Sequence, residues 1–138
     1  MRILQPLMAS IVFALLTGSS TAQDRAPEKP EGVMLTAADH QQNVSQLTVY
    51  DFHNPAAGFE GFQTYWPDGA VVMSLKLKDG KLVHNLGRWR IDGERFCTTW
   101  RLPADSKEAC IRSYKTGDNA YQAWREDGAF SAYWRFRR

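Results

Sequence analysis

The sequence predicts an all-β fold: an antiparallel meander of about eight strands that forms a lipocalin-like barrel or curled sheet, with one short N-terminal helix. Three observations lead to this prediction. Apolar and polar residues alternate with period two after Leu47, turn residues interrupt the alternation at regular spacing, and Asp-Gly occurs four times between the alternating runs. The chain has the length of one domain with one core, which we expect over residues 35–138.

The first residues have the pattern of a signal peptide. Met1-Arg2 supplies a positive start, residues 3–16 are mostly apolar, and small residues up to Ala22 form a cleavage site. We therefore expect residues 1–22 to be removed and the protein to be periplasmic or secreted. A membrane-spanning helix is disfavoured because Pro6 interrupts the apolar run, which is shorter than the roughly 20 residues that a span needs. We expect no integral membrane segment after cleavage.

A leader and a short helix come next. Residues 23–34 are polar and broken by prolines, so they are predicted to be a disordered leader. Thr36 followed by Asp39 then has the spacing of a helix N-cap with an acidic partner three residues later. We expect a helix from there to about Val44, covering one end of the sheet.

The rest of the chain divides into candidate strands. Most of the connections between them are tight turns that contain Asp-Gly, at residues 68–69, 79–80, 92–93 and 127–128, and residues 116–119 form another turn. The predicted strands are Leu47–Phe52, Gly61–Trp66, Ala70–Leu77, Gly87–Ile91, Glu94–Trp100, Ala109–Lys115, Ala120–Arg125 and Ala129–Phe136.

The two cysteines, Cys97 and Cys110, are expected to form one structural disulfide, because an exported chain with two cysteines most simply pairs them. A redox or catalytic pair is the alternative, but the Cys-x-x-Cys spacing is missing. The pairing also sets the register of two neighbouring strands, since it places Cys97 opposite Cys110.

The turns predict which side chains share a face. A two-residue loop at Asp92-Gly93 sets Trp89 opposite Phe96 and Arg90 opposite Arg95. A four-residue loop at 116–119 sets Ile111 by Trp124 and Cys110 by Arg125. One face then forms the core, with contributions from the other strands; its members include Phe62, Val71, Met73, Leu75, Trp89, Ile91, Phe96, Trp100, Ile111, Trp124, Trp134 and Phe136.

The opposite face is rich in arginine, and this is the main functional lead in the sequence. Like charges facing each other on a sheet are unfavourable, so these arginines require acidic neighbours or a bound anion. Glu108, Glu126 and Asp127 are near enough in the predicted sheet to neutralise some of them. The alternatives are a solvated, locally paired surface and an anion-binding patch formed by Arg88, Arg90, Arg95, Arg112 and Arg125.

Other chemistry is poorly supported. His40, His53 and His84 fall in different predicted elements, so we expect no metal site. The sequence has no Gly-x-Ser-x-Gly and no Gly-rich phosphate loop, and we expect neither an enzyme nor a cofactor. A formal net charge of +2 argues against a nucleic-acid partner. Aromatic residues make up 12% of the chain, which fits a packed core or a ligand-lined cavity.

The pattern Gly87-x-Trp89-x-Ile91 followed by Cys97 and Cys110 resembles a family of small exported bacterial proteins of unknown function. In that family a Gly-Thr-Trp-Arg-Ile strand leads to a two-cysteine hairpin; Arg88 stands here in place of the threonine. Trp66-Pro67-Asp68-Gly69 and Leu35-Thr36-Ala37 belong to the same resemblance. It implies a lipocalin-like or related β-barrel and a periplasmic location, and it supplies no catalytic residues.

Taken together, the sequence favours a non-enzymatic periplasmic binding or interaction module. Its partner would be an unknown small ligand or an envelope component. If the arginine face forms the binding site, this partner would carry anionic groups. The alternative is a small periplasmic enzyme or enzyme inhibitor that acts on cell-envelope material.

Overall fold

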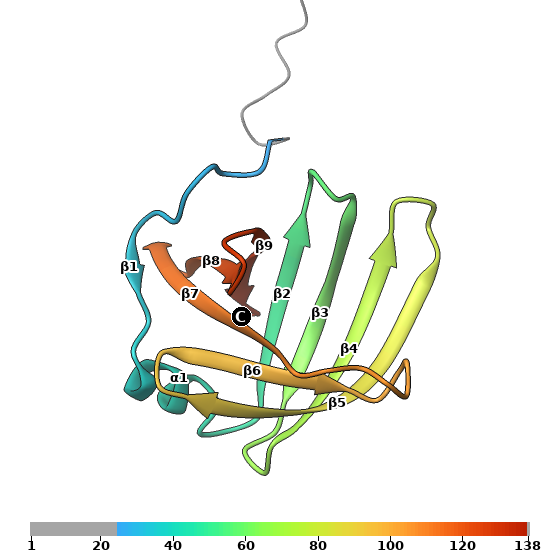
Figure 1. Cartoon of the computed structure of the whole chain (residues 1–138), viewed down its shortest axis with the longest axis horizontal. Helices are drawn as coiled ribbons and strands as arrows, with labels where there is room; N and C mark the ends of the chain where they lie inside the picture. Colours follow the sequence, from blue (N-terminus) through green and yellow to red (C-terminus); the bar gives the residue numbers. More distant parts are fainter. Residues whose placement is uncertain (1–24, 138) are drawn as a thin grey trace, which may run out of the picture.

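The computed structural model describes residues 25–137, so the predicted signal peptide lies outside the described residues. The described part contains nine strands and one helix (Figure 1). In chain order these are β1 (Val33–Met34), α1 (Ala37–Asn43), β2 (Thr48–Asn54), β3 (Phe59–Tyr65), β4 (Ala70–Leu77), β5 (Leu82–Asp92), β6 (Arg95–Trp100), β7 (Ala109–Gly117), β8 (Ala120–Arg125) and β9 (Phe130–Phe136).

Strands β2 to β9 form a closed, eight-stranded antiparallel barrel. Each strand pairs with the next one along the chain, and β9 returns to pair with β2, which closes the sheet. The predicted all-β meander is therefore confirmed, in its barrel form rather than as an open curled sheet. Within residues 25–137 no helix has the length and apolar character that crossing a membrane requires.

The N-terminal segment begins the fold earlier than the sequence suggested. Val33–Met34 was expected to end a disordered leader, but it forms β1 and pairs with Tyr114 and Lys115 of β7. The main-chain N–H of Glu31 also donates to Oε1 of Gln122, at 3.3 Å. Apolar Val-Met can form a strand wherever a neighbouring strand offers unpaired main-chain groups. Strand β7 has such unpaired main-chain groups beyond Ile111, because its ladder with β6 ends at that residue.

The helix α1 starts as predicted. Thr36 is its N-cap, with Oγ1 accepting from the Asp39 N–H, while the Asp39 carboxylate accepts from the Thr36 N–H at 2.8 Å, forming a capping box. These hydrogen bonds lower the pKa of Asp39. The helix lies beside the β5–β6 turn at one end of the barrel (Figure 1), and Val44 directly after it is 1% exposed. The short helix thus covers an end of the barrel.

Three of the four Asp-Gly turns share one geometry. At the β3–β4 turn the Trp66 N–H donates to the Ala70 carbonyl, Gly69 adopts a φ of 95°, and Asp68 Oδ1 accepts from the Ala70 N–H at 3.0 Å. This is a three-residue hairpin loop in which the left-handed position requires glycine. The same arrangement recurs at Asp79-Gly80 and Asp127-Gly128.

The fourth Asp-Gly turn differs from the prediction. The loop of the β5–β6 hairpin is Gly93-Glu94, not Asp92-Gly93, so Asp92 pairs with Arg95 and Ile91 with Phe96. Gly93 has a φ of 59°, which suits the first central position of a primed hairpin turn. The shift moves each cross-strand partner by two residues. Because two is an even number, the predicted core and outer faces of these strands are unchanged.

The β7–β8 hairpin was predicted with the wrong register. Ile111 pairs with Arg125, not with Trp124, because the ladder is irregular between Lys115 and Gly117. A bulge adds one residue to a strand and shifts its register by one. The side chains that were expected on one face of the partner strand therefore lie on the opposite face. Trp124 consequently pairs with Arg112, and its indole N–H donates to Gln122 Oε1 at 3.0 Å, the same oxygen that Glu31 reaches. It is 5% exposed yet lies outside the two core clusters.

The core consists of two adjoining clusters inside the barrel. Most of the predicted core residues belong to them, including Val71, Phe96 and Trp134. Phe62 does not: it alternates with the inward Gln63 and faces outward on β3. The clusters are Leu35, Tyr121, Ala123 and Trp134, and Val44, Tyr65, Val71 and Phe96, with Tyr50, Phe52, Trp89, Ile91, Trp100, Ile111 and Phe136 packed against them.

Candidate functional site

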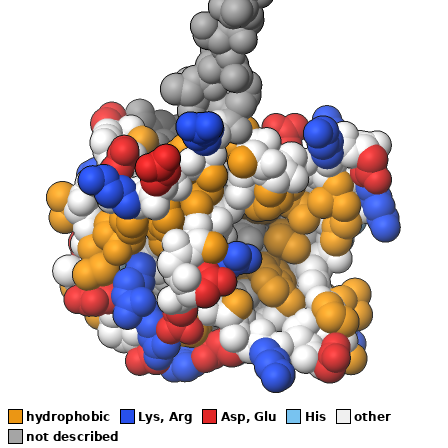
Figure 2. All heavy atoms as spheres, turned by 45° about the horizontal axis from the view of Figure 1, so that its top comes forward, with side chains coloured by type: hydrophobic (Ala, Val, Ile, Leu, Met, Phe, Trp, Pro, Cys, Tyr) orange, Lys and Arg blue, Asp and Glu red, His pale blue; other side chains and the backbone are white. Residues whose placement is uncertain are grey.

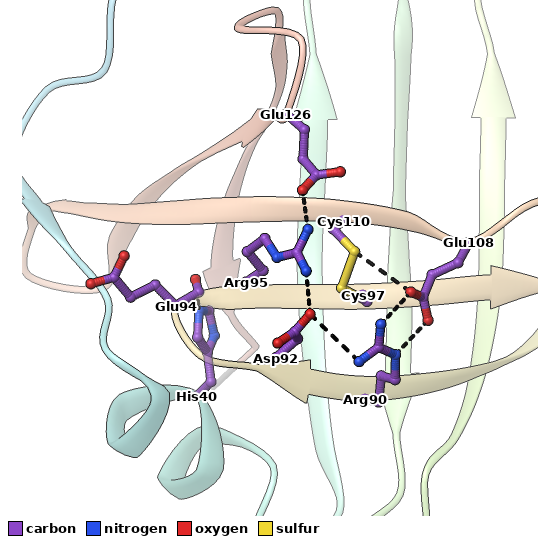
Figure 3. The surroundings of a disulfide bond; sticks show 9 residues. All are labelled: His40, Arg90, Asp92, Glu94, Arg95, Cys97, Glu108, Cys110 and Glu126. Atoms are coloured by element: carbon purple, nitrogen blue, oxygen red, sulfur yellow. Dashed lines mark hydrogen bonds and ion pairs between the residues drawn. A yellow bond between two sulfur atoms is a disulfide. The ribbon is translucent and has the colours of Figure 1, made fainter.

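The predicted arginine face is present on the outside of the barrel, beside the disulfide (Figure 3). Cys97 and Cys110 are bonded and directly opposite each other, as predicted. Arg90 is the direct partner of Cys97 on the neighbouring strand β5. Arg95 lies two residues before Cys97 on β6, and Arg112 lies two residues after Cys110 on β7, so both share this face with the disulfide.

Arg90 is held by Glu108. Its Nε and Nη2 donate to the two carboxylate oxygens at 2.7 and 2.6 Å, which is the paired geometry that best suits guanidinium and carboxylate. The hydrogen bonds raise the pKa of Arg90 and lower the pKa of Glu108. Asp92 lies 3.6 Å from Arg90 Nη1 and adds a second acid on the same side.

The remaining arginines differ in how far they are neutralised. Arg95 forms ion pairs with both Asp92 and Glu126, and it lies between them in Figure 3. Arg88 donates to the Asp68 carbonyl at 2.9 Å. Arg125 lies opposite Ile111 at the end of β8 rather than opposite Cys110, and pairs with Asp127 at 3.5 Å. The side chain of Arg112 has no hydrogen bond or ion pair with any residue of 25–137.

Most of the charge on this face is therefore balanced locally. Three of the acids, Glu108, Glu126 and Asp127, were predicted as neighbours. Asp92 joins them because the β5–β6 turn begins one residue later than predicted. Among residues 25–137, neither Arg88 nor Arg112 has a carboxylate partner, and the Arg112 guanidinium also lacks the carbonyl partner that Arg88 has. Anion binding by the five arginines stays a prediction.

The histidines and the cysteines do not converge on a common site. His40 lies on α1 inside the barrel, whereas His53 and His84 are exposed on β2 and β5. The Glu108 carboxylate is close to both sulfur atoms of Cys97 and Cys110, but these sulfurs are bonded to each other and are not available as thiolate ligands.

One serine–histidine contact was not anticipated from the sequence. Ser74 Oγ and His84 Nδ1 are 3.0 Å apart on the outer side of β4 and β5. The two residues are direct cross-strand partners, which only the β4–β5 register reveals. Within the described chain no carboxylate orients the other ring nitrogen of His84, so the pair lacks the third group of a catalytic triad.

The barrel interior contains a cavity of about 250 Å³. It is lined by side chains from α1 and from seven of the eight barrel strands, most of them aromatic or aliphatic. Figure 2, which turns the top of Figure 1 toward the reader, shows a hollow to the right of the centre with hydrophobic side chains around it. The lining residues are His40, Asn43, Tyr50, Phe52, Phe59, Gln63, Tyr65, Met73, Leu75, Phe96, Ile111, Ser113, Ala123, Ser131, Ala132 and Trp134.

Several polar groups line this cavity, and most of them already have partners. The Tyr65 hydroxyl donates to Gln63 Oε1, the Trp134 indole N–H donates to Ser113 Oγ at 3.3 Å, and His40 Nε2 lies 3.1 Å from the Glu94 carbonyl. Burial lowers the pKa of His40 and raises the pKa of Tyr65. A neutral His40 donating from Nε2 is therefore the form that suits this environment.

Tyr50 differs from the other polar residues of the cavity. Its ring contacts Tyr65, Trp134 and Phe136, with centroid distances of 5.0, 4.7 and 5.0 Å. Its hydroxyl has no hydrogen-bond partner within residues 25–137, although burial raises its pKa and so keeps it protonated. Tyr50, a residue of the cavity lining, thus has a free donor and acceptor in its hydroxyl group. The sequence analysis did not identify it, because only the folded barrel brings Tyr50 to the cavity.

Comparison with known proteins provides no relative. No protein-family profile matches the chain, and no curated protein and no solved structure is significantly similar to it. The resemblance to small exported two-cysteine proteins stays a prediction.

Proposed function

We propose that this protein is a non-enzymatic, exported binding module that holds a small, mainly apolar ligand inside its barrel. The observation that carries the proposal is the interior cavity, with its aromatic and aliphatic lining and the unpartnered hydroxyl of Tyr50. Ligand sites in proteins are typically apolar hollows with a few polar groups that fix orientation. The disulfide agrees with export to an oxidising compartment, and the predicted signal peptide gives the route.

The polar groups suggest the kind of ligand. A molecule with an aliphatic body would contact Phe52, Met73 and Leu75, while a single hydroxyl or carbonyl would reach Tyr50. The cavity is slightly smaller than most drug-binding pockets, which indicates a short ligand. Octanol has this chemistry, and octane is the matched molecule without the polar group.

The experiment is ligand binding by the folded, disulfide-bonded protein. We expect octanol to raise the thermal unfolding midpoint and to displace the apolar dye N-phenylnaphthylamine, because a ligand that binds the native state stabilises it. Ala132→Leu fills part of the cavity and should abolish both effects. Ala38→Leu makes the same change on the exposed side of α1 and should preserve them.

Two results would overturn the proposal. One is an unchanged midpoint at saturating octanol, together with no dye binding by the wild-type protein. The other is equal octanol binding by the wild type and Ala132→Leu, since the ligand would then lie outside the barrel. Circular dichroism checks that both variants are folded before binding is measured.

A further inference from the structure

A second hollow lies on the outside of the barrel, where the sheet presents rows of side chains that cross several strands. We call it the outer groove; its volume is about 1150 Å³. It covers the outer side of β9, β2, β3 and β4, which are consecutive neighbours in the sheet (Figure 1). Thr116 at the end of β7 and Asn119 in the β7–β8 turn contribute to its border.

The first row provides positive charge. Arg135, Asp51, Phe62 and Ser74 are successive cross-strand partners from β9 to β4. Asp51 accepts hydrogen bonds from Arg137 Nε and Nη2 at 3.0 and 2.6 Å, whereas Arg135 Nε is 4.0 Å away and its side chain is 69% exposed. One carboxylate therefore faces two guanidinium groups. A positive charge remains at Arg135 without full compensation.

The second row provides a ring surface beside polar groups. Tyr133, His53, Glu60 and Lys76 are again successive cross-strand partners. The rings of Tyr133 and His53 are stacked, with centroids 5.3 Å apart and an angle of 30°. Glu60 and Lys76 form an ion pair at 3.8 Å and are both more than half exposed. The row thus has an aromatic end and a hydrogen-bonding end.

The dimensions suit a short chain molecule lying across the strands. Neighbouring strands are about 4.8 Å apart, so the groove from β9 to β4 spans about 14 Å. The first and second rows are two residues apart along each strand, or about 7 Å. A ligand between them contacts both the stacked rings and Arg135.

We propose that the outer groove binds an acidic oligosaccharide, with a sugar ring against Tyr133 and His53 and a sugar carboxylate on Arg135. Pyranose rings have apolar C–H faces that pack on aromatic rings, and their hydroxyls bond to exposed ion pairs such as Glu60–Lys76. Guanidinium and carboxylate groups form paired hydrogen bonds. The groove combines these elements on one surface.

An extended peptide fits this surface less well. Peptides commonly bind to sheets by adding a strand at a free edge, where main-chain groups are unpaired. Strands β9, β2, β3 and β4 each pair with a strand on both sides, so the main-chain hydrogen bonds of the groove floor are already used. Binding there must depend on side chains, as it does in sugar recognition.

The test measures binding of three probes to the full folded protein by calorimetry: trigalacturonate, maltotriose and triglutamate. We expect trigalacturonate to bind with an affinity that falls as salt is added, maltotriose to bind more weakly, and triglutamate not to bind. Arg135→Gln should weaken trigalacturonate binding about tenfold, to the level of maltotriose. Arg101→Gln is the control, because Arg101 is exposed outside the groove.

The role of the stacked rings is tested separately. Tyr133→Ala should remove binding of both sugars, and Tyr133→Phe should preserve it, since it retains the ring. Ala132→Leu fills the interior cavity and should leave trigalacturonate binding unchanged, which separates this site from the proposed interior one. No binding of trigalacturonate, equal affinity for triglutamate, or wild-type affinity in Arg135→Gln would each overturn the proposal.

Discussion

Cys97 of β6 and Cys110 of β7 are direct cross-strand partners, and their disulfide joins the two strands of the shortest ladder in the described barrel. That ladder has three residue pairs, compared with seven between β2 and β3. Beyond Ile111 the strand β7 leaves β6 and pairs with β1 instead. The disulfide therefore links β6 and β7 at the place where the fewest cross-strand residue pairs connect two neighbouring strands of the barrel.

Removal of the disulfide should weaken the barrel as a whole. For a loop of this length the chain-entropy model gives a loss of about 3 kcal/mol in the free energy of unfolding. We expect this loss in the double variant Cys97→Ser/Cys110→Ser, measured by urea denaturation, and faster amide exchange at Phe96 and Ile111. Reduced wild-type protein is the control and should behave in the same way. A loss below about 1 kcal/mol in the free energy of unfolding would show that the β6–β7 pairing is stable without the disulfide.

The sequence predicted the elements of this fold better than their pairing. Strand alternation, the Thr36 N-cap and three Asp-Gly turns are local signals, and each was confirmed. The bulge between Lys115 and Gly117 has no comparable signal, and it moved Trp124 from the predicted core to the outer side. The turn at Gly93 shows the same limitation, because Asp-Gly allows the glycine to occupy different loop positions.

The candidate sites were less predictable because long-range pairing creates them. The interior cavity exists because β9 pairs with β2 and closes the barrel. The alternation of apolar and polar residues did not distinguish a closed barrel from a curled sheet. Glu108 and Glu126 were expected near the arginine face, but only the folded chain shows that Glu108 pairs with Arg90 and that Glu126 and Asp92 pair with Arg95. Phe62 was assigned to the core from its apolar character, although its neighbours Gln63 and Tyr65 indicate otherwise once the β2–β3 register is known.

Acidification should destabilise the protein through His40. Burial, the main cause, lowers its folded pKa below the ordinary value of 6.5, although the Glu94 carbonyl and Asp39 partly oppose this. The unfolded chain then binds a proton that the folded chain does not. Stability is therefore complete above about pH 6.5 and is lost as the pH falls from there toward the folded pKa, by at most about 1.4 kcal/mol per pH unit.

His40→Gln tests this pH dependence, because glutamine preserves a donor near the Glu94 carbonyl and does not titrate in this range. The variant should show a smaller change in unfolding midpoint between pH 7 and pH 5 than the wild type. His84→Gln, an exposed position, should retain the wild-type slope. If His40→Gln and the wild type gave the same slope, the destabilisation would come from other groups.

The arginine face should bind polyanions weakly, because Glu108, Glu126 and Asp92 already pair with Arg90 and Arg95. We expect the wild type to elute from a heparin column below about 0.15 M salt, as screened surface charges do. The double variant Glu108→Gln/Glu126→Gln removes two of these carboxylates and should elute at higher salt. Glu28→Gln/Glu31→Gln, a matched change outside this face, should elute much closer to the wild type. Heparin is also an acidic polysaccharide, so strong retention of the wild type would support the predicted anion site only if Arg112→Gln abolished it and Arg135→Gln, in the outer groove, did not.

Tyr50→Phe separates the apolar and polar contributions of the interior cavity. The substitution removes a hydroxyl that has no partner within residues 25–137, so the ligand-free protein should unfold at the same or a slightly higher temperature. Octanol, which is expected to bond to this hydroxyl, should bind about five- to tenfold more weakly, as the loss of one hydrogen bond predicts. Octane should bind equally to both proteins. Tyr114→Phe, a change outside the cavity lining, should affect neither ligand. An equal loss for octanol and octane would mean that the substitution alters the shape of the cavity and that Tyr50 does not select the polar group.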